Sequence, residues 1–230
     1  MSDQKEPLDP STDETPIQPN ESGGDYEFES SSSGMTPSGL TLLVLVSELT
    51  LIFIAVGVAF WFGFHDPSFA LYQAVCEFRE YRPLVGVVLA IPMFGFIVGL
   101  LPRVPRIQES MASIEQQLKP LFRDMRIWQA FFISCCAGIG EEIFFRWFLL
   151  GGLSQYFTWW WACLLSSILF GLGHYLSHTY FMITAGVGVL LAMIYWYFGL
   201  AAAITCHATY DFLAILYLRN KYSVAAVSIG

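Results

Sequence analysis

Besides the isolated Glu48, six ionisable side chains lie within long apolar stretches of the sequence, where a charge is expensive. They are Glu141, Glu142, Arg146, His174, His207 and Asp211. Each ionised group near the centre of a bilayer costs roughly 2.5–3.5 kcal/mol on insertion scales, so a purely structural bundle would be more stable with leucine at these positions. Ionisable residues in such places therefore indicate a functional site.

The spacing of these residues gives most of them a neighbour. Glu142 and Arg146 stand four residues apart with the acid first, which is the favourable order for an ion pair on one face of a helix. Glu141 lies about 100° further round the same helix and remains free for chemistry. His207 and Asp211 are also four residues apart, so Asp211 can orient the imidazole or bind a ligand beside it.

A free carboxylate and two imidazoles on three helices support two kinds of hydrolysis. Glu141, His174 and His207 can hold a zinc ion and leave one coordination position open for water. Alternatively, Glu141 assisted by His174 deprotonates a water directly. His207 and Asp211 then stabilise the oxyanion. Other hydrolytic schemes lack their residues, because the sequence has no HExxH or GxSxG motif and its apolar stretches hold one Asp and no Lys.

The elements that carry these residues are typical of a membrane protein. Hydrophobic residues make up 55% of the chain and charged residues 13%, whereas soluble domains hold roughly 25% charged residues. This balance argues against a disordered or nucleic-acid-binding protein. We predict an all-α, polytopic transmembrane bundle, in which each span takes about 20 apolar residues. The six expected spans are 40–64, 84–101, 127–150, a stretch that follows the tryptophans at 159–161 and ends near 176, 181–198 and 200–218.

The remaining segments are polar. Residues 106–126 repeat Ile, Met and Leu at spacings of three and four among charged residues, which predicts an amphipathic helix in the membrane interface. Residues 1–39 hold nine acidic residues and one lysine, which accounts for the net charge of −8. Their richness in Ser, Pro and Gly predicts a disordered, solvated tail. The domain boundary is therefore expected at residue 40, with a membrane domain over 40–230.

Basic residues predict the orientation of the chain. The loop between the second and third spans is rich in Arg and Lys, and two more basic residues follow the last span. The opposite side carries Arg79 and Arg82. By the positive-inside rule both termini are cytoplasmic. We expect a multi-pass protein, in the cell membrane rather than in the endoplasmic reticulum.

Two smaller features predict contacts between helices. Glu48, the single charge of the first span, is expected to make a polar helix–helix contact or to lie at the interface. Gly95 and Gly99 have the spacing that lets two helices approach closely.

Three motifs occur together on successive helices. They are Glu141-Glu142-Ile143-Phe144-Phe145-Arg146, Phe170-Gly171-Leu172-Gly173-His174 and His207-Ala208-Thr209-Tyr210-Asp211. Each is weak alone, but in their order and spacing they resemble the CPBP (Abi) family of intramembrane proteases, which is related to the CAAX prenyl endopeptidases. The resemblance covers about residues 125–218, so the membrane domain is expected to be protease-like.

This resemblance implies an intramembrane endopeptidase with a water-filled cavity in a helical bundle. It implies that Glu141 and His174 activate water, and that His207 and Asp211 serve the oxyanion or a metal ion. The residues that it places in support of the site are Glu142 and Arg146. The family's last motif usually ends in Asn, so Asp211 favours a metal ion or a protonated Asp at this position.

The same resemblance leaves the substrate and the cofactor open. The expected partners are membrane lipid and a peptide or protein substrate, prenylated or not, and no nucleic acid. The expected cofactor is none or zinc. Two other classes remain as alternatives: a non-catalytic bacteriocin-immunity or scaffold protein of the membrane, and an ion-coupled transporter. The transporter is disfavoured because six short spans without an inverted repeat do not fit its usual architecture.

Overall fold

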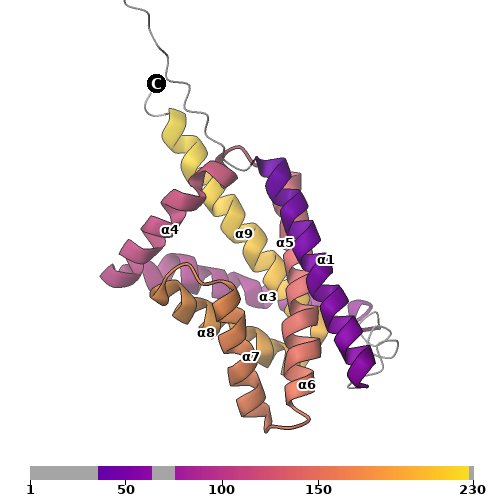
Figure 1. Cartoon of the computed structure of the whole chain (residues 1–230). Helices are drawn as coiled ribbons and strands as arrows, with labels where there is room; N and C mark the ends of the chain where they lie inside the picture. Colours follow the sequence, from indigo (N-terminus) through magenta and orange to yellow (C-terminus); the bar gives the residue numbers. More distant parts are fainter. Residues whose placement is uncertain (1–35, 64–75, 228–230) are drawn as a thin grey trace, which may run out of the picture. The chain divides into compact units, whose positions relative to one another are not determined.

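The computed structural model describes residues 36–63 and 76–227, with side chains up to residue 221. This part of the chain is helical and contains no strand. Figure 1 shows the arrangement of the helices. Their bounds are α1 Pro37–Phe62, α3 Arg82–Phe94, α4 Pro105–Arg123, α5 Ile127–Glu142, α6 Gly151–Leu153, α7 Trp159–Gly173, α8 His178–Phe198 and α9 Leu200–Val227. The acidic tail predicted over residues 1–39 lies outside the described residues up to residue 35.

Two helices continue into wider or tighter turns. α3 passes into a π-helix, η1 (Gly95–Leu100), and then into the 3₁₀ turn η2 (Leu101–Arg103). α5 passes without a break into the π-helix η3 (Ile143–Leu150). Because π-turns are rare and concentrate at functional sites, the junction of α5 and η3 at Glu142 is of particular interest.

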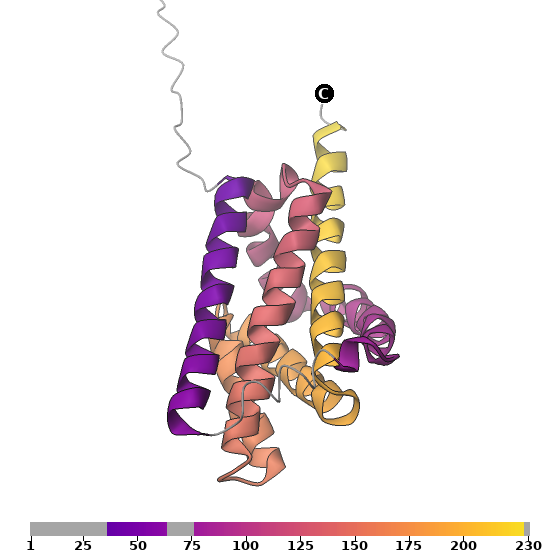
Figure 2. The same cartoon turned by 90° about the vertical axis from the view of Figure 1, so that its right-hand side faces the viewer.

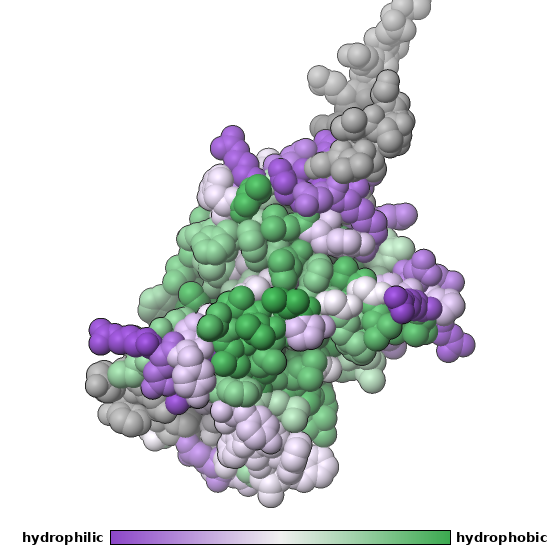
Figure 3. All heavy atoms as spheres, turned by 180° about the vertical axis from the view of Figure 1, so that it is seen from behind, coloured by the Kyte–Doolittle hydropathy of each residue, from purple (hydrophilic) through white to green (hydrophobic). Residues whose placement is uncertain are grey.

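The predicted helical membrane bundle is confirmed. Among the described residues, four helices are long and apolar enough to cross a bilayer: Pro37–Phe62, Arg82–Arg103, His178–Phe198 and Leu200–Lys221. The other two predicted spans correspond to the continuous α5–η3 helix and to α7, which is shorter at 15 residues. The outer surface is apolar, and Figure 3 shows one face on which hydrophobic side chains cover the middle. A surface of this kind suits lipid rather than water, so the protein is a multi-pass membrane protein.

The helix α9 packs against α3, α5 and α8. Two glycines allow its close approach to its neighbours. A Cβ at Gly86 of α3 would lie 2.1 Å from Oγ1 of Thr205, and a Cβ at Gly138 of α5 would lie 2.9 Å from Cβ of Ala208. The approach predicted at Gly95 and Gly99 is wrong, because a Cβ at either position would meet nothing within 4 Å.

The start of α9 is fixed by a buried carboxylate. Glu77 accepts a hydrogen bond from the backbone N–H of Ala201 at 3.1 Å and pairs with Arg82 at 3.1 Å. Gly199, which connects α8 to α9, has a φ of +87° and would place a Cβ 2.6 Å from both groups. Only glycine suits this position. The axial position of α9, and of the side chains that it carries, is set at this point.

The described ends of the chain lie at one end of the bundle. The start of α1 and the end of α9 lie beside the connection between α4 and α5 (Figure 2). This is the connection that carries Arg123 and Arg126. The described ends of α1 and α9 thus lie on the side of the arginine-rich loop, and the compartment that this side faces stays a prediction.

Cysteine labelling can check this orientation. In a variant that lacks the five native cysteines, Gln108→Cys and Ser223→Cys are expected to react from the cytoplasmic side only. Gln155→Cys, in the turn before α7, is the control and is expected to react from the opposite side. Labelling of positions 108 and 223 from opposite sides would contradict the six-span arrangement.

Candidate active site

The junction of α5 and η3 carries a buried ion pair. Nη1 of Arg146 lies 3.0 Å from Oε1 of Glu142, and the two side chains expose 1% and 0% of their surface. The guanidinium also donates from Nη2 to the backbone oxygen of Gly188 in α8, at 3.1 Å, and lies 4.5 Å from the ring centroid of Phe170 in α7. The pair predicted from the four-residue spacing therefore forms, and it joins η3 to α7 and α8.

The same carboxylate holds the imidazole of His207. Nδ1 of His207 lies 2.8 Å from Oε1 of Glu142. Because an ionised carboxylate only accepts hydrogen bonds, Nδ1 carries the proton and donates it to Glu142. The orienting role that we expected for Asp211 at this nitrogen is thus taken by Glu142. Nε2 of His207 faces the other way, towards Glu141.

His174 is oriented by its own helix. It lies at the C-terminal cap of α7, and its Nδ1 is 2.9 Å from the backbone oxygen of Phe170. A carbonyl oxygen only accepts, so Nδ1 carries the proton here as well. Nε2 of His174 is then an acceptor and lies 3.5 Å from Oε1 of Glu141, so a third group with two hydrogens, such as a water, can donate to both.

Glu141 is the point on which both imidazoles converge. Its Oε1 faces His174, and its Oε2 lies 3.9 Å from Nε2 of His207. Oε2 is buried and has no hydrogen-bond partner. Since Glu142 is occupied by Arg146 and His207, Glu141 is the carboxylate that remains available, as its place on the helix predicted.

Asp211 completes the group from the next turn of α9. Its Oδ2 lies 3.5 Å from Nε2 of His207. Both residues line a cavity of about 60 Å³, together with His174, Tyr180 and Tyr210. The structure therefore brings all six predicted residues together from four helical segments: α5, η3, the end of α7 and α9.

A comparison with known families agrees with the motifs. Residues 123–213 match the family model described as type II CAAX prenyl endopeptidase Rce1-like. This segment is Rce1-like. The predicted resemblance to the CPBP family is thereby confirmed over these residues. No curated protein and no solved structure gives a significant match.

The Rce1-like segment runs from the end of α4 to the middle of α9 and contains every predicted site residue. The helices α1 and α3 lie outside it. Sequence reasoning nevertheless missed some residues around the site. Tyr180 and Tyr210 line the cavity, and nothing in their spacing distinguishes them from other aromatic residues of a membrane helix. Glu48 of α1, expected to be a helix contact, is buried close to Glu141.

The metal hypothesis can be compared with this geometry. Within residues 36–63 and 76–221, no group of three or more His, Cys, Asp or Glu side chains is arranged to hold a metal ion. Zinc binding by Glu141, His174 and His207, whose reactive atoms face one another at 3.5–3.9 Å, stays a prediction. The side chains themselves offer a carboxylate and two imidazoles for acid–base chemistry.

Proposed function

We propose that the protein is a CAAX-type intramembrane endopeptidase, in which Glu141 and His174 activate a water for attack on a peptide bond. One observation carries this proposal: Nε2 of His174 and Nε2 of His207 converge on the Glu141 carboxylate, and both histidines line the cavity of about 60 Å³. The Rce1-like match over the same residues supports it. A general base needs a free carboxylate within hydrogen-bond reach of a water, and Glu141 is that carboxylate.

The reaction begins with a water between Glu141 and His174. Glu141 takes one proton from this water. At the same time the oxygen of the water attacks the carbonyl carbon of the scissile bond, which produces a tetrahedral oxyanion. Nε2 of His174, the acceptor nitrogen, orients the second hydrogen of the water. When the intermediate collapses, the carbon–nitrogen bond breaks and Glu141 returns the proton to the leaving amine. The products are a carboxylate and an amine.

The oxyanion lies at the other end of the cavity, beside His207 and Asp211. A neutral Asp211 whose Oδ2–H turns to the oxyanion makes this end of the site a hydrogen-bond donor. Donors fixed in place before the reaction stabilise a developing oxyanion more than water does, because they need not reorganise. The Nδ1 contact with Glu142 keeps the ring of His207 in the required orientation.

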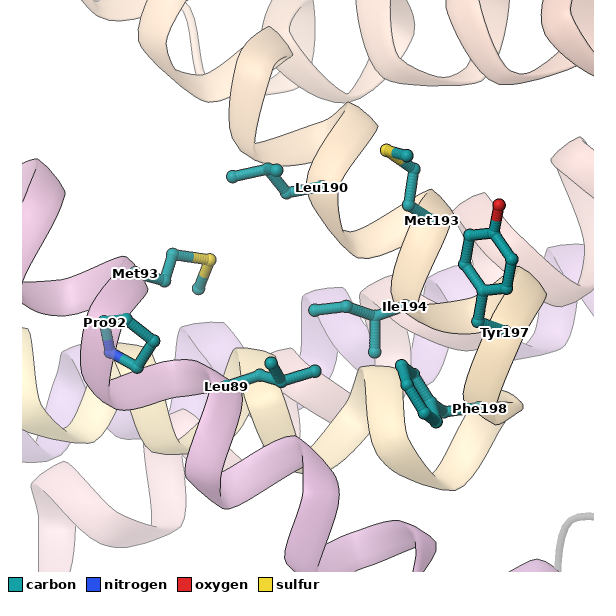
Figure 4. Close-up of a pocket in the computed structure, with 8 residues that line it drawn as sticks. All are labelled: Leu89, Pro92, Met93, Leu190, Met193, Ile194, Tyr197 and Phe198. Atoms are coloured by element: carbon teal, nitrogen blue, oxygen red, sulfur yellow. The ribbon is translucent and has the colours of Figure 1, made fainter.

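Two apolar pockets are linked to this cavity through shared lining residues. A pocket of about 300 Å³ lies between α3 and α8. Figure 4 shows the residues that line it: Leu89, Pro92, Met93, Leu190, Met193, Ile194, Tyr197 and Phe198. A second pocket of about 330 Å³ shares Leu190 with the first. It shares Ile97, Ile183 and Val187 with the catalytic cavity. A peptide that carries an apolar chain, such as a prenyl group, suits these two apolar pockets.

Peptide cleavage by the purified protein tests the proposal. The full chain in lipid nanodiscs is incubated with a peptide that ends in a CAAX sequence, in farnesylated and in unmodified form, and the products are identified by mass spectrometry. We expect cleavage of the farnesylated peptide at one bond, and slower cleavage of the unmodified peptide. A protein that binds the peptide but never cleaves it would favour the immunity or scaffold class.

Replacement of Asp211 distinguishes the metal-free reaction from a zinc reaction. In Asp211→Asn the amide supplies a neutral donor at the same place, so activity is expected to hold or rise at neutral and higher pH, and chelators are expected to have no effect. A zinc enzyme would instead lose roughly 10–100-fold in metal affinity or activity with this carboxylate. Stoichiometric zinc in the purified protein, with activity lost on chelation and restored by zinc, would overturn the metal-free reaction.

A further inference from the structure

Glu48 is a buried acid that the reaction described above does not use. It lies in the middle of α1, outside the Rce1-like segment, and exposes 7% of its surface. Its neighbours along the helix on both sides are exposed. α1 packs against α5, so Glu48 faces the helix that carries Glu141 rather than the lipid.

The contact between α1 and α5 is built around this side chain. A Cβ at Gly140 would lie 2.3 Å from Oε2 of Glu48 and 2.8 Å from its Cβ. Any residue other than glycine at position 140 would therefore displace Glu48. The carboxyl group thus lies on the backbone of the residue directly before Glu141.

Both acids have an oxygen without a partner. Oε2 of Glu48 and Oε2 of Glu141 are buried and accept no hydrogen bond. Oε1 of Glu48 has a long contact of 3.4 Å with the hydroxyl of Ser47. Glu48 also interacts electrostatically with Glu141, His174 and His207. An orphaned buried polar atom is costly, so each of these two oxygens is expected to find a proton donor.

We propose that Glu48, as a neutral carboxylic acid, donates a hydrogen bond to Glu141 and holds that carboxylate in position for the activation of water. Two adjacent ionised carboxylates would repel each other and leave a buried charge unpaired, whereas one shared proton satisfies both orphaned oxygens. Glu48 acts through Glu141 and does not touch the substrate, so it is a positioning residue. The expected effect on catalysis rests on the proposed protease function. The hydrogen bond from Glu48 to Glu141 does not depend on that function.

Kinetics of two Glu48 variants test the consequence. Glu48→Gln keeps a donor, and its kcat is expected to stay within about threefold of the parent. Glu48→Leu fills the same space without a donor, and kcat is expected to fall about 10–100-fold at unchanged KM, because small misplacements of a catalytic group have effects of this size. Ser47→Ala is the control and is expected to behave as the parent. Equal kcat in the Leu and Gln variants would overturn the positioning role.

Infrared spectroscopy tests the protonation without any substrate. The full chain in nanodiscs at neutral pH is expected to show a carboxylic-acid C=O band that is lost in Glu48→Gln and retained in Glu77→Gln. A band unchanged by Glu48→Gln would overturn the proposal. If no peptide is cleaved, the proposed function fails, but the infrared spectrum still shows whether Glu48 is protonated. If Glu48→Leu does not fold, the infrared difference spectrum between the parent and Glu48→Gln tests the proposal instead.

Discussion

Glu141→Gln is expected to abolish detectable peptide cleavage and to leave the protein folded. The amide cannot take a proton from water, and loss of a general base lowers rates by about 10²–10⁴-fold. Stability should hardly change, because the amide oxygen can still accept the hydrogen bond proposed from Glu48 and the histidine contacts of this side chain are longer than 3.4 Å. Initial rates on the farnesylated peptide and the melting temperature in detergent measure the two effects.

The matched control for this substitution is Glu109→Gln. Glu109 is exposed on α4, so the variant makes the same chemical change away from the cavity and is expected to keep both activity and melting temperature. If Glu141→Gln retained a substantial part of the parent rate, another group would have to serve as the base. The proposed reaction would then be wrong.

Glu142→Ala is expected to destabilise the protein by about 3–5 kcal/mol, as for a buried ion pair that loses one partner. Arg146 would be left with its charge in a site that exposes 1% of its side chain. The substitution also removes the acceptor for Nδ1 of His207, so activity should fall together with stability. Reversible unfolding in mixed micelles gives the free energy of unfolding.

A double variant identifies the cause of this loss. In Glu142→Ala combined with Arg146→Met, the uncompensated charge is absent, so the double variant should be more stable than Glu142→Ala alone. Its activity should remain low, because His207 still lacks its acceptor. Equal losses of stability in the variants of Glu141 and Glu142 would contradict the division of roles between the two acids.

Most of the fold and the composition of the site followed from the sequence. Apolar length and periodicity located the helices, and a four-residue spacing identified the Glu142–Arg146 pair. The hydrogen-bond partner of each histidine nitrogen could not be predicted from the sequence. From the sequence, Asp211 was the expected neighbour of His207, and only the packing of α5 against α9 brings Glu142 to Nδ1.

Contacts between membrane helices were the least predictable feature. Helices that are apolar on all sides carry no periodicity to indicate which face meets a neighbour. Gly95 and Gly99 had the expected spacing but meet nothing, whereas Gly86 and Gly140 allow close approaches. The place of Glu48 depends on such an approach, so a single charge in the first span could not be connected with Glu141 in advance.

The shortness of α7 determines the depth of the reaction in the bilayer. Fifteen residues of α-helix rise about 22 Å, whereas the hydrocarbon core is about 30 Å thick. α7 begins at Trp159, in the run of tryptophans typical of a membrane boundary, and ends directly before His174. With α7 along the membrane normal, the imidazole would lie about 8 Å below the arginine-rich surface. Two or three extended residues of a flexible peptide span that distance, so under the proposed function a substrate need not cross the membrane itself.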